Sequence, residues 1–172
     1  STDCLVADPG YYVDSLLGTA QSSQTACVVG TYNPNTGSTT PTDCVDADAG
    51  HYVDQPGQFT QIACLAGTYN PNTGSTTPTD CVDADAGHYV DQPGQFTQIA
   101  CLAGTYNPNT GSTTSTDCVV ADAGHYVDSS LGLAQTSQTA CNAGTYNPST
   151  GSTSSTDCLV ADPGYYVDSL LG

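Results

Sequence analysis

The chain has 172 residues and contains neither lysine nor arginine, so its 17 acidic residues, all of them aspartate, give a formal net charge of -17. This composition excludes nucleic-acid binding, because neutralising phosphates requires Lys or Arg, and it excludes polybasic attraction to anionic lipid. No run approaches the ~18 apolar residues that a bilayer-spanning helix needs.

Repetition organises the sequence. Residues 1–18 recur letter for letter as residues 155–172, which indicates a 154-residue super-repeat within a longer tandem array. Five cysteines, at intervals of 40, 37, 37 and 40 positions, mark finer modules: Cys4, Cys44, Cys81, Cys118 and Cys158. We therefore predict modules at 1–43, 44–80, 81–117 and 118–157, with the start of the next super-repeat at 158–172. The two central modules differ at a single position, where the first has Pro78 and the second has Ser115.

In chain order, each module is predicted to contain two related halves. Both halves carry Gly-x-Tyr with a cysteine 12 positions after the tyrosine in the central modules, as Tyr52 and Tyr69 show. Gly-His-Tyr-Val-Asp in the first half and Gly-Thr-Tyr-Asn in the second predict short strands, because β-branched and aromatic residues cluster there. The following Asn-Pro-Asn-Thr-Gly, at Asn33, Asn70 and Asn107, predicts a tight turn. Three extra residues in the first half of each outer module indicate a surface loop.

Helices longer than a turn are not expected, because no stretch has helical periodicity and Gly or Pro recurs about every six residues. Apolar residues make up 37% of the chain, below the roughly 45–50% of a typical globular domain. Such small units usually need covalent staples. We expect a small disulfide-rich, mostly irregular or all-β fold, an elongated tandem array of short hairpins whose contacts run between sequence neighbours.

Nine cysteines supply the staples, and two nearest-neighbour pairings are open. One keeps a constant separation of 17 positions and joins Cys27 to Cys44, Cys64 to Cys81, Cys101 to Cys118 and Cys141 to Cys158. The other joins Cys4 to Cys27 and continues in that phase, with separations of 20 and 23. We favour the first, although sequence alone does not fix connectivity. Stable disulfides imply an oxidising compartment, hence secretion or the cell surface.

The string Cys-Leu-Ala-Gly-Thr-Tyr, at Cys64 and Cys101, is followed by Thr-Gly-Ser-Thr and a closing cysteine. This pattern resembles the ephrin-receptor-like cysteine-rich repeat and the first-loop module of tumour-necrosis-factor-receptor repeats. It is also similar to repeat tracts of secreted microbial fibre and surface proteins. The resemblance implies an extracellular, disulfide-laddered rod and favours the pairing of Cys27 with Cys44.

No catalytic constellation is evident. His51, His88 and His125 occupy one repeated position that is Tyr11 and Tyr165 in other copies. Exchange with tyrosine indicates a flat ring that packs on its neighbour rather than an acid, a base or a metal ligand. The sequence also lacks a Gly-x-Ser-x-Gly elbow, and zinc-type cysteine spacing is absent. We expect no enzymatic activity.

Calcium is the one metal that the composition suggests. Hard oxygen ligands gathered in a loop suit Ca²⁺, and the candidate ligands are Asp46, Asp48, Asp83 and Asp85. Because Asp46 and Asp83 become valine in the outer modules, a solvated acidic face that attracts counterions diffusely is the favoured interpretation.

Hydroxyl-rich tracts precede the closing cysteines and have the composition of O-glycosylated stalks. Unmodified turn-forming threonine is the alternative. The candidate O-glycan positions are Thr36, Ser38, Thr39, Thr40, Thr42, Thr73, Ser75, Thr76, Thr77, Thr79, Thr110, Ser112, Thr113, Thr114 and Thr116. No N-glycan acceptor is present, because Pro148 interrupts the one candidate.

These observations predict an extracellular structural protein, a disulfide-stapled rod that self-associates into a fibre or forms a surface stalk, with attached glycans as partners. The alternative is a cell-surface adhesin or receptor-like module that recognises carbohydrate or protein.

Overall fold

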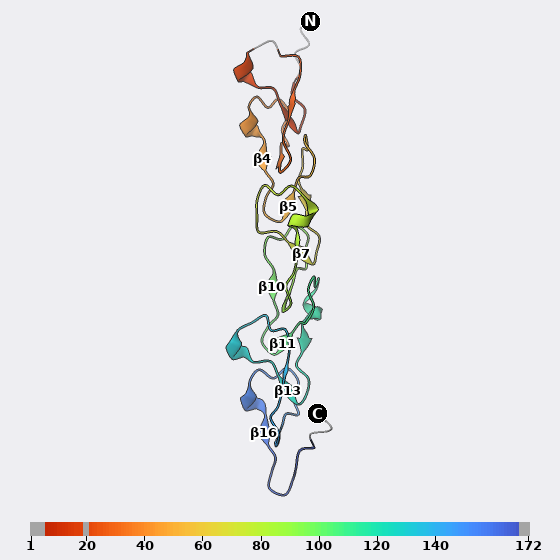
Figure 1. Cartoon of the computed structure of the whole chain (residues 1–172), viewed down its shortest axis with the longest axis vertical. Helices are drawn as coiled ribbons and strands as arrows, with labels where there is room; N and C mark the ends of the chain where they lie inside the picture. Colours follow the sequence, from red (N-terminus) through yellow and green to blue (C-terminus); the bar gives the residue numbers. More distant parts are fainter. Residues whose placement is uncertain (1–5, 19–20, 169–172) are drawn as a thin grey trace. The chain divides into compact units, whose positions relative to one another are not determined.

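The computed structural model describes residues 6–18 and 21–168, and within these ranges all regular structure is very short (Figure 1). Among the described residues, every strand has two residues, and the only helical segments are single 3₁₀ turns of three residues. This architecture confirms a small, mostly irregular and β fold made of repeated hairpins.

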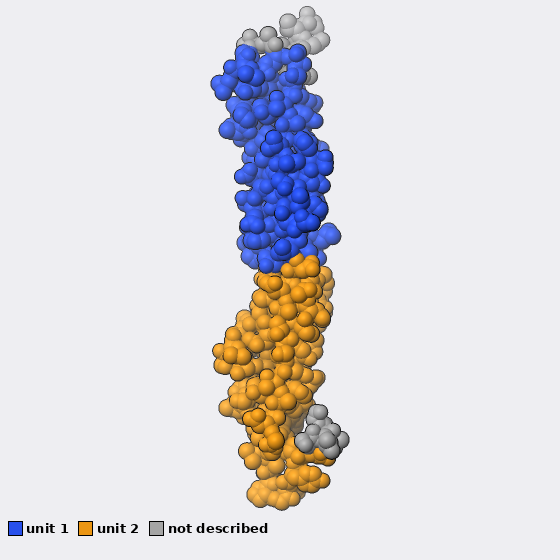
Figure 2. Space-filling view, in the orientation of Figure 1, with its two compact units in different colours: residues 1–82, 92–97 blue, residues 83–91, 98–172 orange. Residues whose placement is uncertain are grey.

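The chain forms two compact units (Figure 2). Unit 1 comprises residues 1–82 and 92–97, and unit 2 comprises residues 83–91 and 98–172. The strands of unit 1 are β1 (Tyr11–Tyr12), β2 (Thr25–Ala26), β3 (Thr31–Tyr32), β4 (Val45–Asp46), β5 (His51–Tyr52), β6 (Ile62–Ala63) and β7 (Thr68–Tyr69). Its 3₁₀ turns are η1 (Ser15–Leu17), η2 (Pro41–Asp43) and η3 (Pro78–Asp80).

Unit 2 repeats the same elements, and the division between the units falls within β8 (Val82–Asp83). Its strands are β9 (His88–Tyr89), β10 (Ile99–Ala100), β11 (Thr105–Tyr106), β12 (Val119–Val120), β13 (His125–Tyr126), β14 (Thr139–Ala140), β15 (Thr145–Tyr146) and β16 (Leu159–Val160). Its 3₁₀ turns are η4 (Ser115–Asp117), η5 (Ser129–Leu131) and η6 (Ser155–Asp157).

The two halves of a module close their hairpins differently. In a first half, the Gly-x-Tyr strand pairs antiparallel with the residues just before the next cysteine, as β5 does with β6. In a second half, the equivalent strand pairs with the residues just after that cysteine, as β3 does with β4. Each second half is therefore completed by the beginning of the following module.

A small set of residues forms the interior of each module. Ala47, Val53, Cys64 and Asn70 are fully or almost fully buried in module 2, and Ser75 is buried beside them. Module 3 buries the equivalent residues Ala84, Val90, Cys101, Asn107 and Ser112. Two of the five are polar, so packing alone cannot account for the fold, and their hydrogen bonds become decisive.

Glycine allows the halves to approach one another closely. Gly50 has a φ of 86°, and a Cβ built there would lie 2.1 Å from the carbonyl oxygen of Gly94 in the next module. No side chain fits that space, and the left-handed conformation also disfavours one. The first half of one module therefore touches the first half of the next.

The longer first halves of the outer modules contain the exposed turns Ser15–Leu17 and Ser129–Leu131, as expected for a surface loop. Asp14 caps η1 by accepting a hydrogen bond from the amide of Leu16, and Asp128 accepts one from the amide of Ser130 before η5. The strands expected at Gly-His-Tyr and Gly-Thr-Tyr are also present, shortened to two residues.

Candidate functional site

Four disulfides join the repeats at identical separations. They are Cys27–Cys44, Cys64–Cys81, Cys101–Cys118 and Cys141–Cys158, with Cα atoms 5.6–5.7 Å apart. These are the pairs of the 17-residue alternative, and Cys4 lies outside the described residues. Each bridge ties the start of a second half to the start of the next first half, which are the segments that β3 and β4 also bring together.

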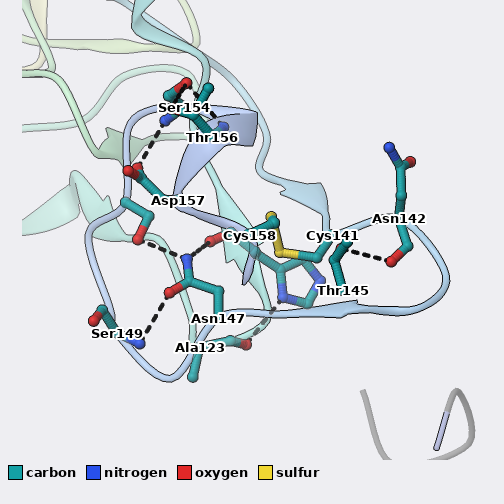
Figure 3. Close-up of a disulfide and its surroundings, with 12 residues drawn as sticks. Ala123, Cys141, Asn142, Thr145, Asn147, Ser149, Ser154, Thr156, Asp157 and Cys158 are labelled. Atoms are coloured by element: carbon teal, nitrogen blue, oxygen red, sulfur yellow. Dashed lines mark hydrogen bonds between the residues drawn. A yellow bond between two sulfur atoms is a disulfide. The ribbon is translucent and has the colours of Figure 1, made fainter. Parts of the chain in front are cut away.

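A buried asparagine connects each second half to the first half before it. Asn70 Nδ2 donates to Ser75 Oγ over 2.8 Å and to the His51 carbonyl over 3.2 Å, while its Oδ1 accepts from the Asn72 amide over 3.1 Å. Figure 3 shows the equivalent Asn147 below the Cys141–Cys158 bridge, with its Oδ1 accepting from Ser149. The predicted turn is thus organised by an amide that is itself part of the core.

Two of the four aspartates proposed as calcium ligands, Asp48 and Asp85, hydrogen-bond to glutamines. Gln61 Nε2 donates to Asp48 Oδ2, and Gln61 Oε1 accepts from the Asp48 amide, both over 2.6 Å. Asp85 and Gln98 form the same reciprocal pair. Asp46 and Asp83 are exposed. Within residues 6–18 and 21–168, no group of three or more His, Cys, Asp or Glu side chains is arranged to hold a metal ion.

The end of each hydroxyl-rich tract is a rigid turn. Asp80 Oδ2 accepts hydrogen bonds from the amides of Thr76 and Thr77, at 2.9 and 3.0 Å. Backbone bonds from Thr77 and then Thr76 lower the pKa of the Asp80 carboxyl below its ordinary value, because they favour the charged form. Figure 3 shows the same turn at Ser154, Thr156 and Asp157.

The structure divides the candidate O-glycan residues into two groups. Ser38, Ser75 and Ser112 are buried, and each hydroxyl accepts a hydrogen bond from a buried asparagine. A buried hydroxyl has no room for a sugar, so these three serines are removed from the candidate set. The threonines are exposed, except Thr40, which is half-buried. Three pairs of hydroxyls bond to each other at 2.6–2.8 Å, namely Thr40 with Thr42, Thr77 with Thr79, and Thr114 with Thr116.

Two residues at the repeated histidine position, His51 and Tyr11, pack against the following module. A Cβ built at Gly94 would lie 3.2 Å from Cε1 and Nε2 of His51, so the imidazole rests on that glycine. Tyr11 occupies the same place against Gly57. On its other side, His51 Nδ1 lies 3.3 Å from the Ala49 carbonyl oxygen.

A shallow apolar groove lies over the Cys64–Cys81 bridge in unit 1. It has a volume of about 250 Å³, and its walls include Tyr52, Ile62, Leu65 and Pro78. Leu65 is 75% exposed. The equivalent groove over Cys101–Cys118 in unit 2 has a volume of about 100 Å³, with Ser115 in place of Pro78.

The Asp–Gln pairs were not predicted, although the sequence contains a signal for them. Each of these glutamines lies three positions before a cysteine. Its aspartate partner lies four positions after the previous cysteine in the sequence. The pairs are Asp8–Gln24, Asp48–Gln61, Asp85–Gln98 and Asp122–Gln138.

In comparisons with known proteins, no family model matches the chain and no curated protein is significantly similar to it. The part of the chain that the structure describes contains no helix long and apolar enough to cross a membrane.

Proposed function

We propose that the protein is an extracellular structural protein, a disulfide-stapled tandem repeat that forms a fibre or a surface stalk. The observation that supports this most strongly is the recurrence of one set of contacts between successive halves in both units. The four disulfides favour an oxidising environment outside the cytosol.

Backbone hydrogen bonds illustrate this recurrence. In unit 1, the Gly50 amide donates to the Asn70 carbonyl over 2.7 Å, and the Val53 amide donates to the Ser75 carbonyl over 2.9 Å. In unit 2, Gly87 donates to Asn107 and Val90 donates to Ser112 over 2.8 and 2.9 Å. A molecule built from one repeated interface can extend by adding copies without closing on itself.

The surface charge fits a solvated fibre or stalk. The chain has no cationic side chain to pair with its 17 aspartates, so neighbouring copies repel one another unless salt, cations or glycans intervene. Exposed threonines along the hydroxyl-rich tracts provide attachment points for O-linked sugars, which would keep such a surface hydrated.

Electron microscopy tests the structural role directly. Native material, viewed after negative staining at several salt concentrations, is expected to contain filaments or stalks of constant width. Reduction before imaging should abolish them, because each half depends on its bridge. Dispersed particles in all conditions, or filaments indifferent to reductant, would contradict the proposal.

The second candidate is a binding module of an adhesin or receptor. The two apolar grooves favour it, because exposed apolar surface in so polar a chain is typical of a contact site. A glycan and protein array separates the candidates: saturable binding to one ligand supports an adhesin, whereas a structural fibre shows none.

A further inference from the structure

We propose that the groove over the Cys64–Cys81 bridge holds a neutral sugar that is O-linked to Thr77 or Thr79 of the adjoining turn. This inference rests on the glycan-bearing surface included in the proposed function, and it names where one sugar sits.

The chemistry of the groove fits a neutral occupant with one apolar face. Its lining contains no aspartate, although the chain carries 17 of them. An acidic ligand would be repelled by the surrounding aspartates, and the lining itself has no carboxylate that would select a basic ligand over a neutral one. The apolar C–H face of a hexose ring can pack on Tyr52, Leu65 and Pro78 while its hydroxyls stay in water.

The turn that carries the two candidate attachment points also forms part of the groove wall. Pro78 lines the groove, and the exposed residues Thr77 and Thr79 flank it in sequence. Bonds from two backbone amides to the Asp80 carboxylate fix this turn. A sugar attached there is tethered at an effective concentration of millimolar order or above, so even a weak contact with the groove is populated.

The paired hydroxyls are compatible with one attachment. Thr77 Oγ1 and Thr79 Oγ1 lie 2.7 Å apart. When a glycosyltransferase joins one hydroxyl oxygen to the anomeric carbon of a nucleotide-activated sugar, the bond from that carbon to the nucleotide phosphate breaks. The nucleotide leaves with the electron pair of that bond, and a base of the transferase takes the hydroxyl proton. The resulting ether oxygen still accepts a hydrogen bond from the second hydroxyl.

The chain contains its own comparison. Module 3 has the same hydroxyls at Thr114 and Thr116, but Ser115 replaces the proline and the groove is smaller. The attached sugar should therefore pack less closely in module 3. Exchanging these two residues is structurally safe, because η3 and η4 have the same three-residue form.

The test uses the full chain purified from its glycosylated source. Peptide mass spectrometry with electron-transfer fragmentation maps the sugars, and methyl NMR then follows Leu65 before and after enzymatic removal of O-glycans. We expect a sugar on Thr77 or Thr79 and a shift of the Leu65 methyl signals upon its removal. Leu17, which is 77% exposed and belongs to a different turn, is the matched control and should not shift.

Two variants sharpen the result. Pro78→Ser should reduce the Leu65 shift, and Ser115→Pro should increase the corresponding shift at Leu102. Absence of sugar at both threonines, or a sugar whose removal leaves Leu65 unchanged, would overturn the inference. Shifts produced only by a free monosaccharide, or only by raising protein concentration, would assign the groove to an external ligand or to a second copy and would equally overturn it. Microscopy of the deglycosylated chain tests fibre formation separately.

Discussion

At the scale of single residues, stability depends on polar side chains that are buried with their partners. Asn70 has no exposed surface, and it satisfies a serine hydroxyl, a carbonyl and an amide at once. Because a buried polar group without a partner costs about 1–3 kcal/mol, each such asparagine is expected to stabilise its module by an amount of this order.

Asn70→Ala is therefore expected to lower the free energy of unfolding by roughly 2–4 kcal/mol. It leaves Ser75 and the His51 carbonyl without their donor and the Asn72 amide without its acceptor. Urea denaturation followed by circular dichroism measures the change. Asn72→Ala, at an exposed side chain in the same turn, is the control and should be nearly neutral. Equal effects of the two changes would contradict this role of Asn70.

The capping aspartates predict a loss of stability in acid. Backbone hydrogen bonds from Thr40 and Thr39 lower the pKa of Asp43, and those from Thr77 and Thr76 lower the pKa of Asp80. Each carboxylate therefore contributes stability above its ordinary pKa of 3.8, and that contribution is lost as pH falls through the lower folded value.

Melting temperature measured between pH 2 and pH 6 checks this sign. Asp80→Asn should reduce the fall in melting temperature at low pH, because the amide cannot titrate. Asp91→Asn, at an exposed position outside the turn, removes the same charge and separates this effect from the relief of repulsion in acid. A steeper fall in Asp80→Asn would show the opposite linkage.

At the scale of elements, covalent bridges replace a large apolar core. Replacing Cys64 and Cys81 together with serine should lower stability by about 3 kcal/mol, the chain-entropy value for a loop of this size. The rate of hydrogen exchange should rise most for the amides of β6 and β7, because Cys64 lies between these two strands in the sequence and the bridge anchors it to Cys81. Calorimetry and exchange that match the parent chain would show that the bridge is dispensable.

Close approach between modules gives a second prediction at this scale. Gly50→Ala and Gly132→Ala both place a side chain at positive φ, which costs about 1–2 kcal/mol. Only Gly50 faces a carbonyl oxygen, whereas nothing lies within 4 Å of Gly132. The melting temperature should therefore fall further for Gly50→Ala, and equal losses would show that the contact between modules contributes nothing.

Local sequence patterns predicted where the strands and turns lie better than they predicted which residues contact one another. Gly-His-Tyr located β5, and the constant 17-residue separation favoured the disulfide phase that the structure has. The burial of Asn70 could not be predicted, because an asparagine before proline has the same signature in an exposed turn. Its partners His51 and Ser75 come together only when successive halves dock. The sequence likewise does not show that Leu65 is exposed, because hydropathy describes a residue and not its neighbours.

At the scale of the whole molecule, the unit of construction is the module rather than the half. A second half needs the following cysteine for its disulfide and the following strand for its hairpin. A first half closes its own hairpin but packs against the halves on either side. We therefore expect that modules can be added or removed only in whole numbers.

Deletion of residues 44–80 tests this rule. The deletion brings Cys81 to the place that Cys44 occupied after Cys27, so every remaining half keeps a neighbour of the correct kind. We expect a folded chain with its bridges intact and little change in melting temperature. Deletion of residues 64–80 alone instead joins two first halves and removes the partner of Cys81. Thiol titration should then reveal an additional free cysteine, and the melting temperature should fall. If both deletions are tolerated equally, the halves are independent and the contacts between them do not define the array.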